Sequence, residues 1–152
     1  MVRAGKGGTA APVFLEKGVV AIGWYDVDWT KYDDSKSIQA VLGELAPVKS
    51  IRQRIAAASQ IERFLRGIKI GDRVVTHDAS RRIFLLGTID GAPLYAPHKI
   101  SDLSTQRSVR WDSVVLRDRV SYKARKALGA ISTLFLVADW AAAELEAKRD
   151  SL

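Results

Sequence analysis

The sequence predicts a single α+β domain, and three observations support this class. Residues 51–66 place apolar side chains at the three-and-four spacing of one helical face. Residues 72–77 and 83–89 are apolar runs separated by a polar turn, a pattern typical of a β-hairpin. The chain has 152 residues, of which 47% are hydrophobic and 27% are charged, so it is long enough to enclose one core.

Short strands and helices are predicted to alternate at the start of the chain. Residues 2–4 predict a short strand that ends in a glycine-rich loop. Residues 11–17 predict a helix with Thr9 as its N-cap, and Gly18 ends this helix. The apolar, β-branched run over residues 18–24 is bounded by glycine and predicts a buried strand.

Two helices are predicted next. The polar, aromatic and acidic residues 25–35 predict a loop, and residues 37–45 predict a short helix that Pro47 ends. Ser50 is a favourable N-cap for the helix over residues 51–66. The apolar face of this helix consists of Ile51, Ile55, Ala58, Ile61, Phe64 and Leu65.

The second half of the chain is predicted to be mostly β. After the hairpin, residues 93–96 extend the sheet, residues 98–106 form a polar loop, and residues 109–116 form another strand. Residues 121–128 predict a short basic helix, and the Ala/Glu/Lys-rich residues 140–149 predict a helical tail.

Several kinds of chemistry are excluded by residue type. The chain has no cysteine, which excludes disulfides, cysteine-ligated zinc and a thiol nucleophile. Its two histidines, His77 and His98, are expected at the surface and give little material for a metal site. The glycine-rich residues 5–8 lack the spacing of a phosphate-binding loop. We therefore expect no catalytic residues, no cofactor and no metal.

Membrane insertion and secretion are not expected either. No apolar run approaches the roughly 20 residues that a membrane-spanning helix needs. Residues 1–8 lack the apolar core of a signal peptide, so a cytoplasmic location is expected.

Positive charge is concentrated in two stretches. The sequence holds 24 Lys and Arg against 17 Asp and Glu, a formal charge of +7. Residues 99–126 contain eight cations and three acids, and six further cations lie from Arg52 to Arg73. Clustered positive charge indicates a polyanionic partner, although a solvated basic surface without a partner has the same signature.

Aromatic side chains accompany this charge. Trp24 ends an apolar strand and opens a loop that contains Tyr25, Trp29 and Tyr32. Flat rings beside cations are what a base-stacking site needs, whereas the alternative is that these rings belong to the core. Trp111 lies inside a predicted strand and is expected to be structural.

A resemblance is carried by several segments taken in order: residues 2–8, 14–24, 60–64, 68–76, 85–89, 107–111 and 127–129. Together they resemble the N-terminal recognition domain of Mrr-like and McrB-like modification-dependent restriction enzymes, which is similar to the EVE and YTH modules of the PUA-like superfamily. The resemblance covers residues 1–137 and leaves residues 138–152 as a C-terminal helical tail.

The resemblance implies a fold and a function. The fold would be a PUA-like, strongly curved antiparallel β-barrel with flanking helices. The module would bind modified double-stranded DNA, flip a methylated or hydroxymethylated base into an aromatic pocket, and target a restriction or defence system. A nuclease or NTPase would act from another domain or subunit. The alternatives are an RNA-binding module acting on tRNA or rRNA, a small enzyme, and a protein-interaction domain centred on Trp140.

The resemblance also implies site residues. The pocket residues would be Arg3, Ala4, Gly5, Lys6, Trp24, Tyr25, Trp29, Ser59, Gln60 and Tyr95. Trp24 is the expected stacking ring, and one of the three tyrosine or tryptophan side chains from the loops would form the second wall. Loop and exposed-helix positions indicate phosphate contacts at Arg81, Arg82, Lys99, Arg107, Lys123 and Arg125.

Overall fold

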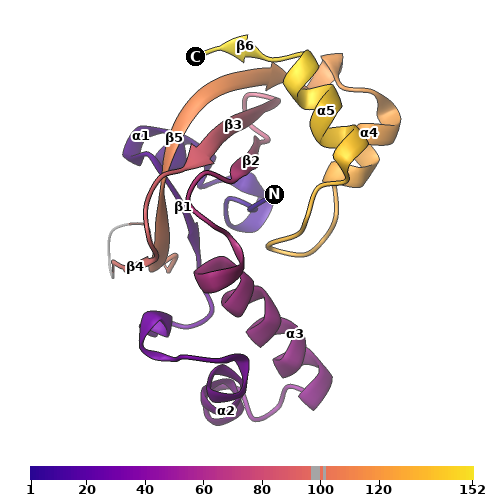
Figure 1. Cartoon of the computed structure of the whole chain (residues 1–152). Coiled ribbons are helices and arrows are strands. Elements are labelled where there is room, and N and C mark those ends of the chain that lie inside the picture. Colours follow the sequence, from indigo (N-terminus) through magenta and orange to yellow (C-terminus); the bar gives the residue numbers. More distant parts are fainter. Residues whose placement is uncertain (97–99, 101) are drawn as a thin grey trace.

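The protein has an α+β structure in which an antiparallel sheet curls into a half-barrel (Figure 1). The computed structural model describes residues 1–96, 100 and 102–152. Within them the helices are α1 (Ala11–Lys17), α2 (Ser35–Leu45), α3 (Ile51–Glu62), α4 (Tyr122–Leu128) and α5 (Asp139–Ala147). The strands are β1 (Val19–Ile22), β2 (Arg73–Asp78), β3 (Ile83–Ile89), β4 (Leu94–Tyr95), β5 (Thr105–Leu116) and β6 (Asp150–Ser151). The predicted α+β class is confirmed.

The long strand β5 organises the sheet. Its first part pairs with β1 and β4, and its second part pairs with β3 and β6. Strand β2 pairs with β3, as the predicted hairpin requires. The register shifts between Leu86 and Gly87, where a Cβ atom on Gly87 would lie 2.6 Å from Val109 Cγ1. This close approach between β3 and β5 requires glycine.

The start of β5 corrects a prediction. The sequence predicted a polar loop up to residue 106, whereas Thr105 and Gln106 belong to the strand and are buried. Pairing with β1 on one edge and β4 on the other satisfies the backbone of this polar segment. His98, expected in the same loop, lies outside the described residues.

Local capping signals match the structure in part. Helix α1 spans the predicted residues, and Gly18 ends it at a left-handed φ of 64°. Ser50 caps α3 as predicted, since its hydroxyl accepts from the backbone N–H of Gln53 at 3.1 Å. Thr9 is not a cap, because its hydroxyl donates to the Lys6 carbonyl at 3.0 Å.

Buried apolar side chains form two groups. The larger group includes Phe14, Trp29 and Phe64 and joins β1 to α1 and to the segment that follows α3. The smaller group includes Val115 and Leu145 and lies between the sheet and helices α4 and α5. Helix α5, predicted as part of a tail, therefore packs against the body of the protein.

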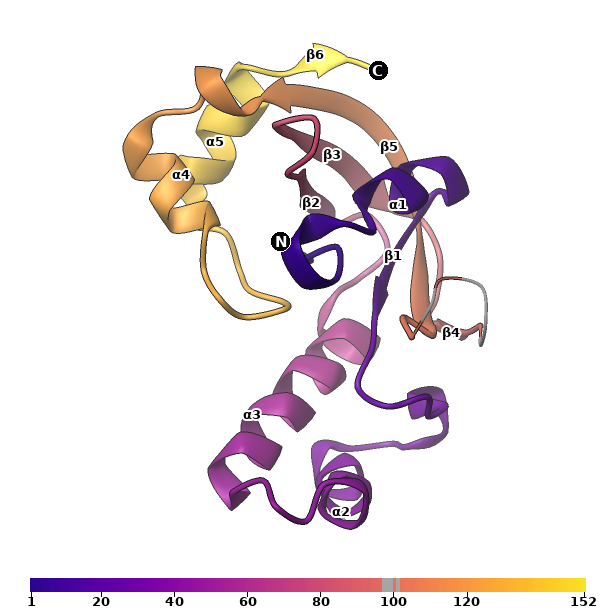
Figure 2. The ribbon, with the colours of Figure 1, turned by 180° about the vertical axis from the view of Figure 1, so that it is seen from behind.

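Helices α2 and α3 form a pair that projects away from the half-barrel (Figures 1 and 2). Ala58 and Ile61 near the C-terminal end of α3 are fully buried, whereas Ile51 and Ile55 are 67% and 47% exposed. Only four of the six residues of the predicted apolar face are buried, because the body of the protein does not reach the far end of the pair.

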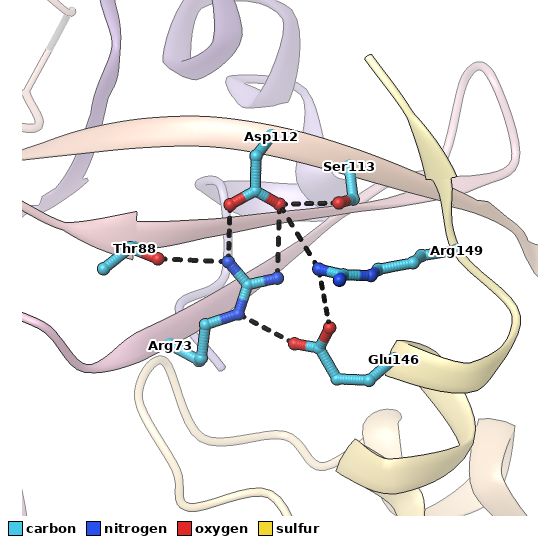
Figure 3. Close-up of polar contacts among 6 residues, drawn as sticks. All are labelled: Arg73, Thr88, Asp112, Ser113, Glu146 and Arg149. Atoms are coloured by element: carbon cyan, nitrogen blue, oxygen red, sulfur yellow. Dashed lines mark hydrogen bonds and ion pairs between the residues drawn. The ribbon is translucent and has the colours of Figure 1, made fainter.

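A charge network fastens α5 to the sheet (Figure 3). Arg73 on β2 donates to Asp112 on β5 at 2.7 Å and to Glu146 on α5 at 2.7 Å. Arg149 lies 3.0 Å from the Glu146 carboxylate. The Arg73 guanidinium holds the pKa of Asp112 below its usual range. The network joins three elements that are far apart in sequence.

Glu144 joins α5 to the start of α4. Its carboxylate accepts from the Ser121 N–H at 2.6 Å, from the Ser121 hydroxyl at 2.7 Å and from Lys148 Nζ at 2.9 Å. The bond from the Ser121 backbone, with those from Lys148 and the Ser121 hydroxyl, lowers the pKa of Glu144 from 4.5 to about 2. A carboxyl group whose pKa is lowered by folding stabilises the fold at pH values above its unfolded pKa. This stabilisation is lost as the pH falls through the folded pKa.

We expect Glu144→Gln to lower the free energy of unfolding by about 1 kcal/mol at pH 7, the size of a lost cap at a partly exposed site. The deficit should shrink between pH 4.5 and pH 2, where the wild-type carboxylate also becomes protonated. Urea unfolding at pH 7 and at pH 3 measures this difference, with the exposed Glu16→Gln as the control. An equal deficit at both values would assign the effect to packing instead.

Candidate functional site

A pocket of about 340 Å³ opens between the N-terminal loop, the end of β1 and the segment that follows α4. Its lining residues are Arg3, Gly5, Lys6, Gly23, Trp24, Leu103 and Thr133. The first three of these and Trp24 were predicted as pocket residues, and the structure brings them together. The other three were not predicted. Gly23 adjoins Trp24, but no sequence signal pointed to Leu103 or Thr133.

The N-terminal side of the pocket depends on glycine. Gly5 has a φ of 68° and a ψ of −168°, a conformation open essentially to glycine alone. Gly8 has a φ of 74°, and a Cβ atom there would lie 2.8 Å from the carbonyl oxygen of His77. Lys6 lies exposed between these glycines. The glycine-rich loop therefore shapes the pocket and places a cation at it.

The opposite side contains strained backbone. Trp24 and Tyr25 have φ values of 65° and 58°, in the left-handed region that bulky residues rarely adopt. Each such residue costs about 1–3 kcal/mol, and strain of this kind is concentrated at functional sites. The Trp29 indole donates to the Trp24 carbonyl at 3.0 Å. The strained turn is thus held in place by a hydrogen bond from within the core.

Trp29 corrects a prediction. The sequence offered it as a second wall of the pocket, but its side chain is fully buried and packs against Tyr32. A ring enclosed by the core has no face left for a ligand. Trp29 is instead a positioning residue, because its indole N–H anchors the carbonyl of Trp24.

The third side of the pocket is formed by the segment from Ile131 to Leu134, which is hydrogen-bonded to the N-terminal residues. Arg3 donates from its guanidinium to the Ile131 carbonyl at 2.6 Å and from its backbone to the Thr133 carbonyl at 2.8 Å. The Gln60 side-chain carbonyl accepts from the Leu134 N–H at 3.0 Å. Gln60 therefore buttresses this wall from α3 and does not line the pocket.

Four other predicted pocket residues lie elsewhere. Ala4 is buried and lines a neighbouring cavity of about 190 Å³. Ser59 is exposed on α3, and Tyr25 is 40% exposed beside Trp24. Tyr95 on β4 donates to Asp26 at 2.9 Å, and this bond to a carboxylate raises the pKa of the phenol. None of these four residues lines the pocket with Trp24.

His77 lines the smaller cavity together with Ala4. It is half-buried and not a surface residue as expected, and its ring lies 4.8 Å from that of Phe84. Burial lowers its pKa, and the positive charge of Arg117 adds to this effect. The histidine is therefore neutral at pH 7 and adds no charge to the cavity.

Arg107 was predicted to contact phosphate, and the structure contradicts this. The residue is only 3% exposed. Its guanidinium donates to the carbonyls of Gly91 at 2.8 Å, Phe64 at 3.1 Å and Ile68 at 2.7 Å. All three contacts are internal, so Arg107 serves the fold.

Two other arginines from the same prediction are engaged in ion pairs. Arg81 lies 2.5 Å from the buried carboxylate of Asp78, and Arg82 pairs with the exposed Asp118. The Arg82 pair is solvated and contributes little to stability. To contact a phosphate, either arginine would have to divide its N–H donors between the phosphate and its carboxylate partner.

The remaining predicted cations lie on α4 or outside the described part of the chain. Lys123 places its ammonium 4.8 Å from the centre of the Trp140 ring, a cation–π contact. Arg125 is partly buried, and its Nε atom has no hydrogen-bond partner among the described residues. Lys99 lies outside the described residues.

A larger cavity of about 410 Å³ lies between β2 and the segment from Leu134 to Glu146. Its walls are mostly aliphatic. The charged groups Arg73 and Glu146 at its edge are already paired within the network of Figure 3, whereas Arg63 and Asp139, which also line it, form no ion pair with a described residue. The smaller pocket beside Trp24 places the polar groups of Lys6 and Thr133 next to an aromatic ring, as a pocket that orients a flat ligand needs.

Neither a metal-binding cluster nor a membrane-spanning helix is found in the described part of the chain. It contains no cluster of three His, Asp or Glu side chains that could hold a metal ion. None of its helices has both the length and the apolar character needed to cross a membrane.

Comparison with known proteins places most of the chain in a family. A family model described as a domain of unknown function (DUF8426) matches residues 6–132. This range includes Lys6, Trp24 and Leu103 of the pocket. No curated protein and no solved structure matches the chain.

Proposed function

The chain belongs to the DUF8426 family, and we propose that it binds double-stranded DNA and takes up one methylated or hydroxymethylated base in the pocket beside Trp24. One observation carries the proposal. Arg3, Lys6 and Trp24 were expected at a base pocket, and they line a single pocket of about 340 Å³. A flat ring and two cations then meet at one site, as base stacking next to a phosphate requires.

The size and lining of the pocket suit a single base. Ligand pockets range from about 300 to 1,000 Å³, so this one lies at the small end. Unstacking a base costs a few kcal/mol, and stacking on an aromatic ring returns about 1–3 kcal/mol. A methyl group packed against Leu103 would add about 0.8 kcal/mol, and the Thr133 hydroxyl is suited to a hydroxymethyl group.

The fold supports the same proposal. A curled antiparallel half-barrel with helices beside it is compatible with a PUA-like barrel of the EVE and YTH type. In this proposal the domain is the targeting part of a restriction or defence system in the cytoplasm. Cleavage would come from a nuclease or an NTPase-driven partner, in another domain or another subunit.

A binding panel tests the proposal. One duplex is prepared unmodified and with each base modification in turn, and its affinity is measured by fluorescence anisotropy at fixed salt concentration, because phosphate contacts make affinity salt-dependent. At least one modified duplex should bind ten times more tightly than the plain one. Equal affinities throughout would contradict the proposal. Structured RNA that displaced every duplex would favour an RNA-binding module instead.

A further inference from the structure

One stripe of exposed residues runs along α3 and ends on Arg63, the residue that directly follows this helix. Arg52, Ala56, Ser59 and Arg63 follow one another at spacings of four, three and four, which places them on one side of the helix. All four are exposed. The opposite side of the helix holds the fully buried Ile61. We refer to these four residues as the α3 stripe.

The two arginines at the ends of the stripe are not engaged by the fold. Neither Arg52 nor Arg63 forms an ion pair with any residue that the structure describes, whereas the neighbouring Arg66 pairs with Glu62. Arg63 lies eleven positions after Arg52, which corresponds to about 16 Å along the helix axis. This length matches about five base-pair steps of 3.4 Å along one DNA strand.

The two residues in the middle of the stripe project little from the helix surface. Ala56 and Ser59 have small side chains, so a phosphate backbone can approach the helix surface between the two arginines. The serine hydroxyl is also a donor suited to a phosphate oxygen. A long side chain at either position would hold a polyanion away from the helix.

The helix that carries the stripe reaches a wall of the pocket through Gln60, whereas Arg63 lines the larger cavity of about 410 Å³. Gln60, next to Ser59 in sequence, binds the Leu134 N–H, and the preceding Thr133 lines the pocket. From that point α3 runs outward, because the α2–α3 pair projects beyond the half-barrel (Figure 2). A duplex that places a base in the pocket would therefore pass within reach of α3.

We propose that the α3 stripe is a second docking surface, which lies against the phosphate backbone of the duplex whose base enters the pocket. This inference rests on the proposed function, and it adds which part of the protein holds the DNA outside the pocket. Backbone contacts position a protein on DNA without reading its sequence. The stripe should therefore contribute affinity for any duplex, whereas the pocket contributes the preference for a modified base.

The test is the double variant Arg52→Gln/Arg63→Gln, compared with Lys17→Gln/Lys36→Gln, which removes two exposed lysines from α1 and α2. Affinity is measured against salt concentration for modified and plain duplexes. Loss of two phosphate contacts should reduce the salt slope by about two and weaken both duplexes alike, by at least tenfold at low salt. The ratio between the two affinities should not change, and the lysine control should keep the wild-type slope.

A steric variant gives an independent readout. Ala56→Leu preserves charge and helix propensity, and it should weaken both duplexes by blocking close approach. An unchanged salt slope in the double arginine variant, or a changed ratio of modified to plain affinity, would overturn the role of the stripe. Wild-type protein that bound no duplex would instead refute the proposed function itself. If the double arginine variant had a reduced salt slope only with structured RNA, DNA would be overturned as the ligand of the stripe.

Discussion

A Trp24→Ala variant should bind modified and plain duplexes with nearly equal affinity. Base stacking on an aromatic ring contributes about 1–3 kcal/mol, so losing the ring should weaken binding of the modified duplex by about 5- to 150-fold. Plain duplex held by phosphate contacts alone should keep its affinity and its salt slope. Fluorescence anisotropy with paired duplexes at several salt concentrations measures both quantities.

Two comparisons separate stacking from folding. Trp24→Phe retains a flat ring at the same backbone position and should keep most of the preference. Trp140→Ala removes a 44% exposed tryptophan from α5 and should leave the preference intact. Thermal unfolding confirms that each variant is folded, since Trp24 also packs against the larger core. Full preference in Trp24→Ala would show that the base pocket lies elsewhere on the protein.

The part of the pocket that could be predicted is the part with local signals. Lys6 lies in a glycine-rich loop, and Trp24 follows a glycine-bounded apolar strand, so each stands out in its own segment. Thr133 reaches the pocket through contacts with distant parts of the chain, among them the bonds from Arg3 to the carbonyls of Ile131 and Thr133. These bonds join residues about 130 positions apart, and a single sequence contains no signal for them.

The same limit explains the elements that were misjudged. Residues 83–89 were predicted as a strand and form β3 with these bounds, because their apolar character is local. Thr105 and Gln106 are polar and indicated a loop, yet pairing on both edges makes them part of β5. For Ile51 and Ile55, periodicity indicated the correct face of the helix but not how far the body of the protein covers it.

Arg107 was misjudged because its neighbours in sequence are basic and because its hydrogen-bond partners come from distant segments. In the sequence it is one of many cations in a basic stretch, where an exposed phosphate contact is the simplest expectation. In the structure it is buried on β5, and its guanidinium joins the segment after α3 to the residues that follow β3. Burial lowers the pKa of Arg107, but a guanidinium stays protonated at physiological pH. The fold thus keeps a charge where three carbonyl oxygens need a donor.

We expect Arg107→Met to lower the free energy of unfolding by about 3 kcal/mol, since each buried carbonyl left without its donor costs about 1–3 kcal/mol and removal of the buried charge offsets part of the loss. Arg107→Lys should recover little, because one ammonium cannot reproduce the planar donor geometry. Urea unfolding measures these changes, with the exposed Arg110→Met on the same strand as the control, expected within about 0.5 kcal/mol of wild type. At a temperature where Arg107→Met is folded, its salt slope for DNA should equal that of wild type. A stable variant with a reduced slope would restore Arg107 as a phosphate contact.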